Sequence, residues 1–421
     1  MSGVLGIFSF EEDVEVFPLM YYGLYALQHR GQAEVGIGTL TNDGEVEVHK
    51  FPGLVSDHFG KGLIGSMKGN KGLGFLKYKF RNENFDTMPL VKDDKLLLID
   101  GSIDNEDFST DECIDVLARG DVEEIKDYLL GIQGVFVLLF MAKDKFVAYK
   151  NQDGIKPLSI GMYKNTIIAA SESSAIESVG GTLTRELQPG ELLVQEKTTT
   201  FSYYLNNQMQ ATENLDAFEY MYTARPDSVL DGISVYQARF RLGESLWMES
   251  RDTDGVVIGA PDSGMIAAIG FAHASGLNYQ QGFLRNRYVG RTFIQLTQAD
   301  RETSLQIKLT PIKHVVANRN IILIDDSIVR GSTIHRTVKS LREAGARQIH
   351  VRIASPPISH DESVTIDIPN KEELIAYGRT TEEMREIIGC DSLHFLSVNG
   401  FHQAVGKNQM YEPYFKQDWE D

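Results

Sequence analysis

The chain has 421 residues, of which 42% are hydrophobic and 24% are charged, a composition typical of a soluble protein with about two to three domains. Its 41 basic and 59 acidic side chains give a formal net charge of −18, which opposes binding to nucleic acid or to an anionic membrane. The sequence has no apolar run of the length that spans a membrane, and residues 1–7 lack the basic flank of a signal peptide. We therefore expect a cytoplasmic protein whose partners are neither nucleic acid nor a membrane.

The first half of the chain is rich in short apolar runs separated by glycine and aspartate turns, which is typical of β-strands. Strands are expected at residues 35–40, 96–99, 134–141, 146–149 and 166–170. The spacing of apolar residues predicts helices near residues 18–28 and 111–118. This half is therefore predicted to be an α+β or layered domain.

Beyond a polar stretch at residues 206–214, strands and helices alternate. The expected strands lie at residues 255–258, 321–324 and 349–353, and the expected helices at 264–275 and 333–344. Such alternation predicts an α/β domain with a parallel sheet. We place the domain boundary near residue 212, which gives domains at residues 1–212 and 213–421.

The chain contains two cysteines, Cys113 and Cys390. They are too few and too far apart for a disulfide framework or for a four-cysteine zinc or iron-sulfur site within one chain. We expect both to be small buried thiols.

The strongest motif spans residues 321–333, where a β-branched apolar run is followed by two aspartates and by a turn that opens a helix. The carboxyl end of a parallel strand and the start of the next helix together favour phosphate binding. Gly331 can adopt the positive φ of an anion-binding turn, and Asp325 and Asp326 can hold a ribose diol or Mg²⁺. The alternative is a strand, an acidic turn and a helix N-cap with no ligand.

This motif resembles the phosphoribosyl-pyrophosphate (PRPP) motif of type I phosphoribosyltransferases. Further segments resemble the glutamine PRPP amidotransferase family, nearly end to end: residues 22–32, 225–228, 286–295 and 396–398. That family forms phosphoribosylamine in purine nucleotide synthesis. The resemblance implies an Ntn-hydrolase-like αββα sandwich at residues 1–212, which is the family's glutaminase domain, and a type I phosphoribosyltransferase domain with a parallel sheet at residues 213–421.

In the transferase half, the resemblance implies a PRPP site in the loop after residue 324. Its implied residues are Asp325, Asp326, Ser327, Val329, Arg330, Gly331, Ser332 and Thr333. The implied Mg²⁺ ligands are Ser263, Asp325 and Asp326. Arg287 and Arg291 match the family's mobile loop and suit pyrophosphate, because guanidinium groups pair bidentately with phosphate oxygens. Leu296 departs from the family's usual proline.

In the glutaminase half, the residues that the resemblance makes catalytic are degenerate. Ser2 stands where the family has its nucleophilic cysteine, and Lys77 replaces the arginine that binds the glutamine carboxylate. Asp100 and Gly101 occupy the oxyanion-hole positions, where the family has asparagine and glycine. A carboxylate beside a developing oxyanion raises the barrier, and loss of one donor typically costs about 10² to 10³ in rate. We therefore expect no measurable glutaminase activity.

Two alternatives remain open in this half. Asp100 can be a surface turn residue that follows a strand, in which case the oxyanion hole is still absent. Arg30, Gly31 and Gln32 match the family and are expected to be scaffold residues preserved by helix packing.

The iron-sulfur cluster of many bacterial family members is not expected here. Asp216 and Glu362 stand at two of its ligand positions, and the C-terminal Cys-x-x-Cys pair is missing. Mg²⁺ is the only cofactor that we expect.

Three functions fit the sequence. The first is transfer of ammonia or another amine to PRPP with release of pyrophosphate, and the second is full glutamine-dependent activity through Ser2. The third is a non-catalytic paralogue that binds PRPP or nucleotides and regulates or assembles with an active amidotransferase. By resemblance, purine nucleotides are further ligands and the chain forms a homo-oligomer, either a dimer or a tetramer.

Overall fold

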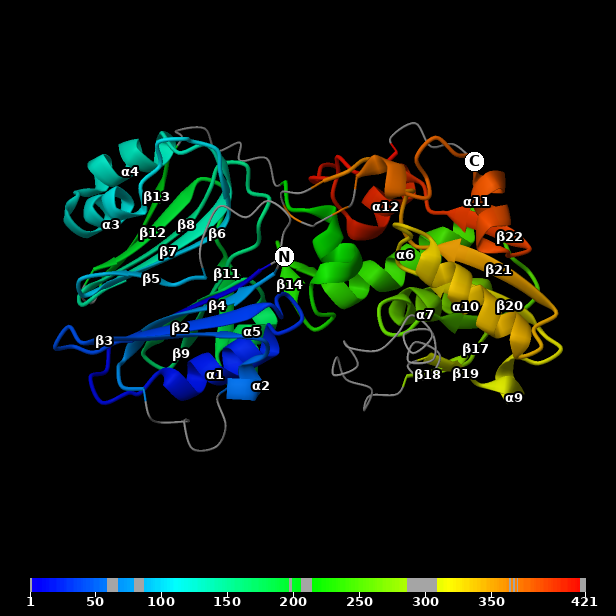
Figure 1. The fold of residues 1–421 in the computed structure, drawn as a ribbon, viewed down its shortest axis with the longest axis horizontal. Coiled ribbons are helices and arrows are strands. Elements are labelled where there is room, and N and C mark those ends of the chain that lie inside the picture. Colours follow the sequence, from blue (N-terminus) through cyan, green and yellow to red (C-terminus); the bar gives the residue numbers. More distant parts are fainter. Residues whose placement is uncertain are drawn as a thin grey trace.

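The structure is a computed structural model that describes residues 2–58, 67–78, 87–196, 199–205, 214–285, 309–362, 365, 368 and 370–416. Two lobes lie side by side, the N-terminal lobe with the elements up to β13 and the C-terminal lobe with the elements from η1 onward (Figure 1). The boundary predicted near residue 212 lies outside the described residues.

The N-terminal lobe contains two stacked sheets. The first is antiparallel, in the order β11 (Thr182–Glu186), β9 (Ser159–Tyr163), β10 (Thr166–Ala170), β1 (Gly3–Ser9), β4 (Lys71–Lys77), β2 (Glu34–Leu40) and β3 (Val46–Pro52). Its outer face is covered by α1 (Phe17–Ala26), α2 (Val55–His58) and α5 (Ser173–Ser178) (Figure 1).

The second sheet has the order β13 (Thr199–Tyr204), β12 (Glu191–Glu196), β8 (Lys145–Lys150), β7 (Gly134–Ala142), β6 (Lys95–Ile103) and β5 (Leu90–Lys92). The helices α3 (Thr110–Arg119) and α4 (Val122–Leu130) cover its outer face (Figure 1). Side chains of β1 alternate between two cores, since Val4 and Phe8 pack between the sheets while Leu5 and Ile7 pack against α1. The predicted αββα sandwich is confirmed.

The C-terminal lobe is built on a five-stranded parallel sheet, as predicted. Its order is β17 (Asn278–Tyr279), β16 (Val256–Gly259), β20 (Asn320–Asp325), β21 (Gln348–Ile353) and β22 (Ser392–Phe395). Helices lie on both faces: α6 (Val235–Ser250), α7 (Gly264–Ser275) and α12 (Val398–Val405) on one, and α10 (Ser332–Glu343) and α11 (Thr381–Ile388) on the other. Residues 321–324 of β20 are all apolar because their side chains alternate between these two cores.

Shorter elements connect the lobes and complete the second one. They are η1 (Glu219–Thr223), β14 (Val229–Leu230), β15 (Ile233–Ser234), β18 (Phe283–Arg285), β19 (Leu309–Pro311), α9 (Lys313–Val316) and η3 (Lys371–Glu373). Among them, η1 is a π-helix that follows directly on the segment joining the lobes.

The strand expected at residues 96–99 is much longer in the structure, whereas the other expected strands agree to within one residue at each end. The strand expected at residues 96–99 continues to Ile103 as β6, because β7 pairs with it from Leu96 to Ile103. Gly101 lies inside this strand with φ +133°, and a Cβ there would stand 1.9 Å from the Val135 carbonyl oxygen. Asp100 is therefore a buried strand residue, so the alternative of a surface turn is wrong.

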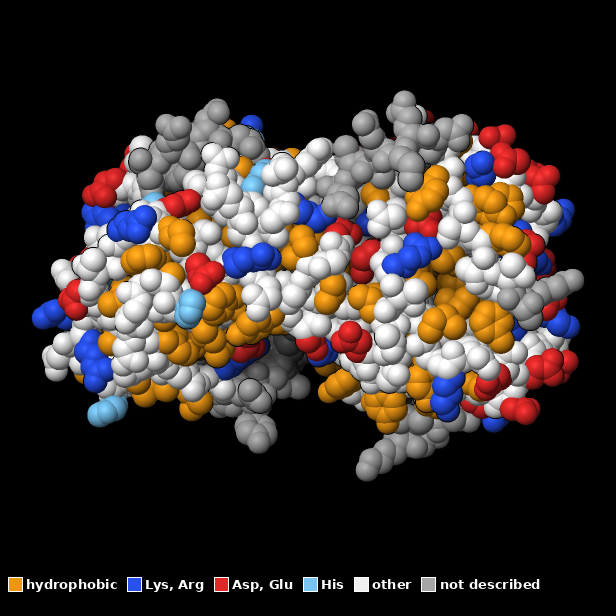
Figure 2. All heavy atoms as spheres, turned by 180° about the vertical axis from the view of Figure 1, so that it is seen from behind, with side chains coloured by type: hydrophobic (Ala, Val, Ile, Leu, Met, Phe, Trp, Pro, Cys, Tyr) orange, Lys and Arg blue, Asp and Glu red, His pale blue; other side chains and the backbone are white. Residues whose placement is uncertain are grey.

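Acidic and basic side chains are interspersed over the face drawn in Figure 2, and apolar side chains form several separate patches on both lobes. In the part of the chain that the structure describes, no helix is both long and apolar enough to cross a membrane. Cys113 and Cys390 are both buried, as expected, and burial raises the pKa of the Cys113 thiol to about 12.

Candidate active site

The loop between β20 and α10 places the sequence motif at the carboxyl edge of the parallel sheet. Strand β20 ends at Asp325, and α10 begins at Ser332. Gly331 joins them with φ +78°, and a Cβ there would stand 2.5 Å from Ile375 Cδ1. Glycine is therefore required at this turn both by conformation and by space. The first residues of α10, Ser332 and Thr333, are exposed beside it.

The two aspartates lie next to each other with their carboxylates fixed by short hydrogen bonds. Asp326 N–H donates to Asp325 Oδ1 at 3.0 Å, and Ser327 Oγ donates to Asp326 Oδ1 at 2.6 Å. Desolvation and the neighbouring charge of Asp326 raise the pKa of Asp325 well above its ordinary value. Burial also raises the pKa of Asp326, although hydrogen bonds from Ser263 and Ser327 oppose the rise. A cation beside the pair would offset the repulsion between the two carboxylates.

Ser263 reaches the pair because α7 starts against the end of β20. A Cβ on Gly264 would stand 2.6 Å from the Ile324 carbonyl oxygen, so glycine lets the helix approach. Two carboxylates and one hydroxyl fit Mg²⁺, which takes one or two carboxylates and completes its shell with water and phosphate oxygens. In the part of the chain that the structure describes, no three His, Cys, Asp or Glu side chains lie where they could jointly hold a metal ion.

The other residues that the sequence analysis singled out for this site point elsewhere or lie outside the described residues. The Val329 carbonyl oxygen accepts from Ile375 N–H at 3.0 Å, and Arg330 Nε donates to Glu373 at 2.8 Å on the exposed side of the loop. Arg287, Arg291 and Leu296 lie outside the described residues. Arg285, the last described residue before them, pairs with Asp262 beside Ser263.

Two residues near the aspartates were not predicted from the sequence. Arg239, buried on α6, donates to the carbonyl oxygens of Tyr220 and Ala224 at 2.8 Å each, and its charge opposes the raised pKa of Asp326. Partial burial and the negative charge of Asp326 raise the pKa of Tyr222. Tyr222 comes from η1, and Arg239 comes from α6, which packs against η1. No local sequence motif identifies either residue.

In the N-terminal lobe, Ser2 is buried at the start of β1. Its Oγ accepts from Tyr78 N–H at 3.3 Å, and its carbonyl oxygen accepts from Arg30 Nε at 3.2 Å. Lys77 lies at the end of β4 with Nζ 3.9 Å from Glu34 Oε2. Ser2 is therefore enclosed, and the Lys77 ammonium group lies near the Glu34 carboxylate.

Asp100 forms a buried ion pair that the sequence did not predict. Its Oδ2 accepts from Lys156 Nζ at 3.2 Å, and their side chains are only 7% and 6% exposed. Lys156 comes from the segment between β8 and β9, 56 residues along the chain. The carboxylate is thus charge-compensated, but an aspartate with this partner still offers no N–H donor at its position.

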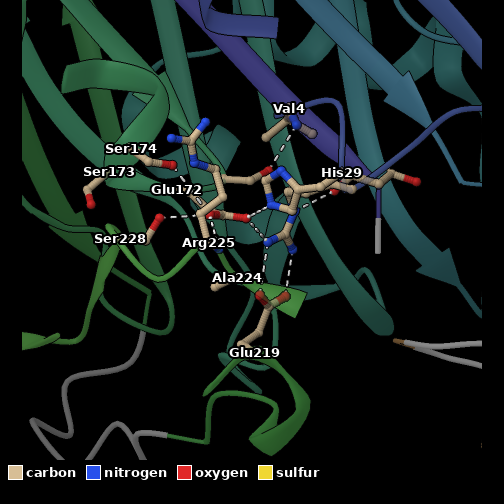
Figure 3. Close-up of polar contacts among 12 residues, drawn as sticks. Val4, His29, Glu172, Ser173, Ser174, Glu219, Ala224, Arg225 and Ser228 are labelled. Atoms are coloured by element: carbon tan, nitrogen blue, oxygen red, sulfur yellow. Dashed lines mark hydrogen bonds and ion pairs between the residues drawn. The ribbon is translucent and has the colours of Figure 1, made fainter. Parts of the chain in front are cut away.

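Arg30 contacts carboxylates of both lobes, Glu172 and Glu219, which are labelled in Figure 3. It donates to Glu172 Oε1 at 2.7 Å in the N-terminal lobe and to both oxygens of Glu219 at 2.9 and 2.5 Å in η1. Glu172 also accepts from Arg225 N–H at 2.9 Å and Ser228 Oγ at 2.7 Å. Arg30 was predicted to be preserved by helix packing, whereas the structure shows ionic contacts across the lobes.

Asp216 and Glu362 both contact tyrosines of the C-terminal segment. Tyr414 Oη donates to Asp216 Oδ1 at 2.7 Å, and Tyr411 Oη donates to Glu362 Oε1 at 3.3 Å. Burial raises the pKa of Asp216 to about 7. Oxygen ligands of this kind do not suit an iron-sulfur cluster, which is held by thiolates.

An αββα sandwich with a buried N-terminal serine, joined to a parallel sheet that ends in a twin-aspartate loop, defines a glutaminase-like domain fused to a phosphoribosyltransferase domain. No family model matches the chain. The amidophosphoribosyltransferase of Bacillus subtilis is 38% identical over 437 residues, covering 96% of this chain and 90% of that protein. The amidophosphoribosyltransferase of Methanocaldococcus jannaschii is 35% identical and covers 97% of this chain and 95% of that protein. The chain belongs to the amidophosphoribosyltransferase family.

Two solved structures share the whole fold. One, described as the allosteric regulatory enzyme of purine biosynthesis, superposes with a TM-score of 0.87 at 35% identity and covers 99% of this chain and 97% of that one. The other is the glutamine PRPP amidotransferase of B. subtilis in complex with ADP and GMP, with a TM-score of 0.85 at 37% identity, covering 98% and 94% of the two chains.

Proposed function

We propose that the chain transfers an amine to PRPP with release of pyrophosphate in purine nucleotide synthesis, and that the amine is ammonia instead of the amide of glutamine. One contrast carries the proposal. The loop with Asp325 and Asp326 matches the PRPP motif and lies between the end of β20 and the start of α10, whereas Asp100, at the position of an oxyanion donor, stands in a buried ion pair with Lys156.

In the transferase reaction, the protein binds and orients the substrates and excludes water from them. Little covalent help from side chains is needed for the change of bonds. The backbone and hydroxyl groups at Gly331, Ser332 and Thr333 bind phosphate at the start of α10. Asp325, Asp326 and Ser263 hold Mg²⁺, which neutralises charge on the departing pyrophosphate when bound. Arg287 and Arg291 belong to the same proposal as pyrophosphate ligands.

Loss of glutamine hydrolysis is the second part of the proposal. Lys77 is a point charge where a bidentate arginine would hold the substrate carboxylate, and Asp100 is an acceptor where a donor is needed. Each change alone slows amide hydrolysis, and an oxyanion-hole loss alone typically costs about 3 kcal/mol. Ser2 is therefore expected to remain unreactive toward glutamine.

The test is to incubate the purified protein with PRPP and Mg²⁺, with either ammonium or glutamine, and to measure pyrophosphate and glutamate. We expect pyrophosphate with ammonium and no glutamate with glutamine. An Asp325→Asn/Asp326→Asn variant is the matched control and should release no pyrophosphate. Glutamate at a rate comparable to pyrophosphate would instead support full glutamine-dependent activity.

The second candidate is a non-catalytic paralogue that binds PRPP or purine nucleotides and assembles with an active amidotransferase. Its nucleotide-binding part is supported by the likeness to a structure in complex with ADP and GMP. Tight binding of PRPP or GMP with no pyrophosphate release would select it. We further propose a cytoplasmic homo-oligomer, a dimer or tetramer, which sedimentation of the purified chain would test.

A further inference from the structure

The interlobe cluster of Arg30, Glu172 and Glu219 contains one cation shared by carboxylates of the two lobes. Arg30 comes from the segment after α1, Glu172 from the segment before α5, and Glu219 opens η1. The three side chains are almost completely buried, at 3%, 0% and 6% exposure. The carboxylates outweigh the effect of burial on Arg30 and hold its pKa above the ordinary value. Arg30 therefore keeps its positive charge inside the protein.

The two carboxylates are not equivalent. Glu172 has further donors, since His29 Nε2 lies 2.6 Å from Oε1 and Ser228 Oγ donates to Oε2 at 2.7 Å (Figure 3). Among the described residues, Arg30 donates every hydrogen bond that the Glu219 side chain accepts, and it contacts both carboxylate oxygens. A buried carboxylate held by one bidentate guanidinium depends on that guanidinium for its position.

Glu219 is the first residue of η1, and Arg239 of α6 also contacts this helix. Arg239 on α6 donates to the carbonyl oxygens of Tyr220 and Ala224, at the start and just beyond the end of η1. Tyr220 and Met221 of η1 pack in the same buried cluster as Ile324, the residue directly before Asp325. The charge of the Arg239 guanidinium opposes the raised pKa of Asp326, and the charges of Asp325 and Asp326 contribute to the raised pKa of Tyr222. A π-helix is a rare conformation that occurs mostly at functional sites. Thus one short helix connects the Arg30 cluster to the twin aspartates.

We infer that Arg30 is a positioning residue for the transferase site: through Glu219 it fixes η1, and η1 sets where Arg239 and Tyr222 stand beside Asp325 and Asp326. This role rests on the proposed PRPP transfer and is independent of glutamine hydrolysis. It gives a physical reason for an arginine to remain beside Ser2, where it also binds the Ser2 carbonyl oxygen, in a lobe whose oxyanion-hole position carries Asp100.

The test removes the Arg30–Glu219 pair and leaves Glu172 with its other hydrogen-bond partners, His29, Arg225 N–H and Ser228 Oγ. The double variant Arg30→Met/Glu219→Gln replaces both partners by uncharged side chains of similar length, and Arg30→Lys keeps the charge but not the fork. We expect the double variant to lower kcat for ammonia-dependent pyrophosphate release by about fivefold or more, the size of a typical coupling between sites. The Arg30→Lys variant should show a smaller loss of kcat than the double variant.

A matched control separates positioning from stability. Arg185 and Glu191 form a bidentate pair of the same kind, at 2.8 and 2.6 Å, within the N-terminal lobe. Arg185→Met/Glu191→Gln should lower the melting temperature and leave kcat and the KM for PRPP unchanged at 25 °C. If both double variants change kcat equally, or neither does, Arg30 has no positioning role.

A second readout does not depend on turnover. Amide hydrogen exchange of Glu219–Thr223 and the Kd of PRPP with Mg²⁺ by calorimetry are measured for the parent chain, the Arg30 and Glu219 double variant and the control. We expect faster exchange in η1 and PRPP binding weakened about fivefold or more in the double variant only. If the parent chain releases no pyrophosphate, the proposed function fails, but these two measurements still decide the role of Arg30. Unchanged exchange and Kd would overturn it.

Discussion

At the scale of single residues, the buried charges of this protein depend on partners far away in sequence. Asp100 depends on Lys156, and Glu219 depends on Arg30. The sequence predicted the residues of the β20–α10 loop because strand, turn and helix start are contiguous there. It could not predict Lys156 or Arg239, because an isolated lysine or arginine on an unremarkable segment carries no local signal of what it contacts after folding.

The Asp100–Lys156 pair predicts the effect of changing one partner. Asp100→Asn leaves Lys156 as a buried cation without its counter-charge, so we expect a loss of about 3 kcal/mol in the free energy of unfolding. Lys156→Gln alone should also destabilise, whereas the double variant should cost less than the sum. Urea denaturation of the four proteins measures the coupling, and strictly additive losses would show that the pair makes no contribution.

Asp216 predicts a pH dependence of stability. Burial raises its pKa to about 7 from an ordinary value of 3.8, so the folded protein prefers the protonated carboxyl. This contribution is fully present below about pH 4 and is lost as the pH rises through about 7. Asp216→Asn keeps the Oδ1 acceptor for Tyr414 and removes the charge, so at pH 8 it should melt about 3 °C higher than the parent, with little difference at pH 4. Equal melting temperatures for both proteins at pH 4, 6 and 8 would contradict this expectation.

At the scale of elements, helices with clear end signals were predicted well. The predicted helix at 264–275 coincides with α7, which ends where Gly276 adopts φ +71°. The predicted helix at 333–344 differs from α10 by one residue at each end. The order of strands in the three large sheets was not predicted, since pairing joins segments far apart in the chain. The π-helix η1 was not predicted either, because five residues give no periodic pattern.

The crossing of α6 and α7 requires glycine on both helices. A Cβ on Gly270 would stand 1.9 Å from the Phe240 carbonyl oxygen, and one on Gly243 would stand 1.8 Å from the Ala267 carbonyl oxygen. We expect Gly270→Ala to cost at least about 2 kcal/mol by forcing the helices apart, in spite of the better helix propensity of alanine. His273→Ala, an exposed position on the same helix, is the control. The midpoint of urea denaturation distinguishes them, and a stabilised Gly270→Ala would show that the backbones separate easily.

At the scale of the whole molecule, the C-terminal segment packs against the connection between the lobes. Asp216 N–H donates to the Ile155 carbonyl oxygen in the N-terminal lobe, while Ala217 N–H donates to the Tyr411 carbonyl oxygen. Tyr414 and Phe415 are buried in the core of the C-terminal lobe. The sequence identified the two-domain architecture, but it could not show that one short segment is held between the first lobe and the last residues of the second.

Removal of this segment should uncouple the lobes. A chain ending at Met410 loses the contacts of Tyr411 and Tyr414, so we expect its thermal transition by calorimetry to fall by about 5 °C or more and to broaden or split into two. A chain ending at Lys416 keeps all of these contacts and is the control. A single sharp transition at the parent temperature for the shorter chain would show that the segment does not join the lobes.

The Asp100–Lys156 pair also bears on how this protein can be engineered or can evolve. On the proposed loss of amide hydrolysis, a return to it would pass through an intermediate in which one of the two residues has changed and the other is left as an unpaired buried charge. Selection acting on single mutations therefore disfavours the reversal, even where each end state is viable. A library designed to recover glutamine use should randomise both codons together.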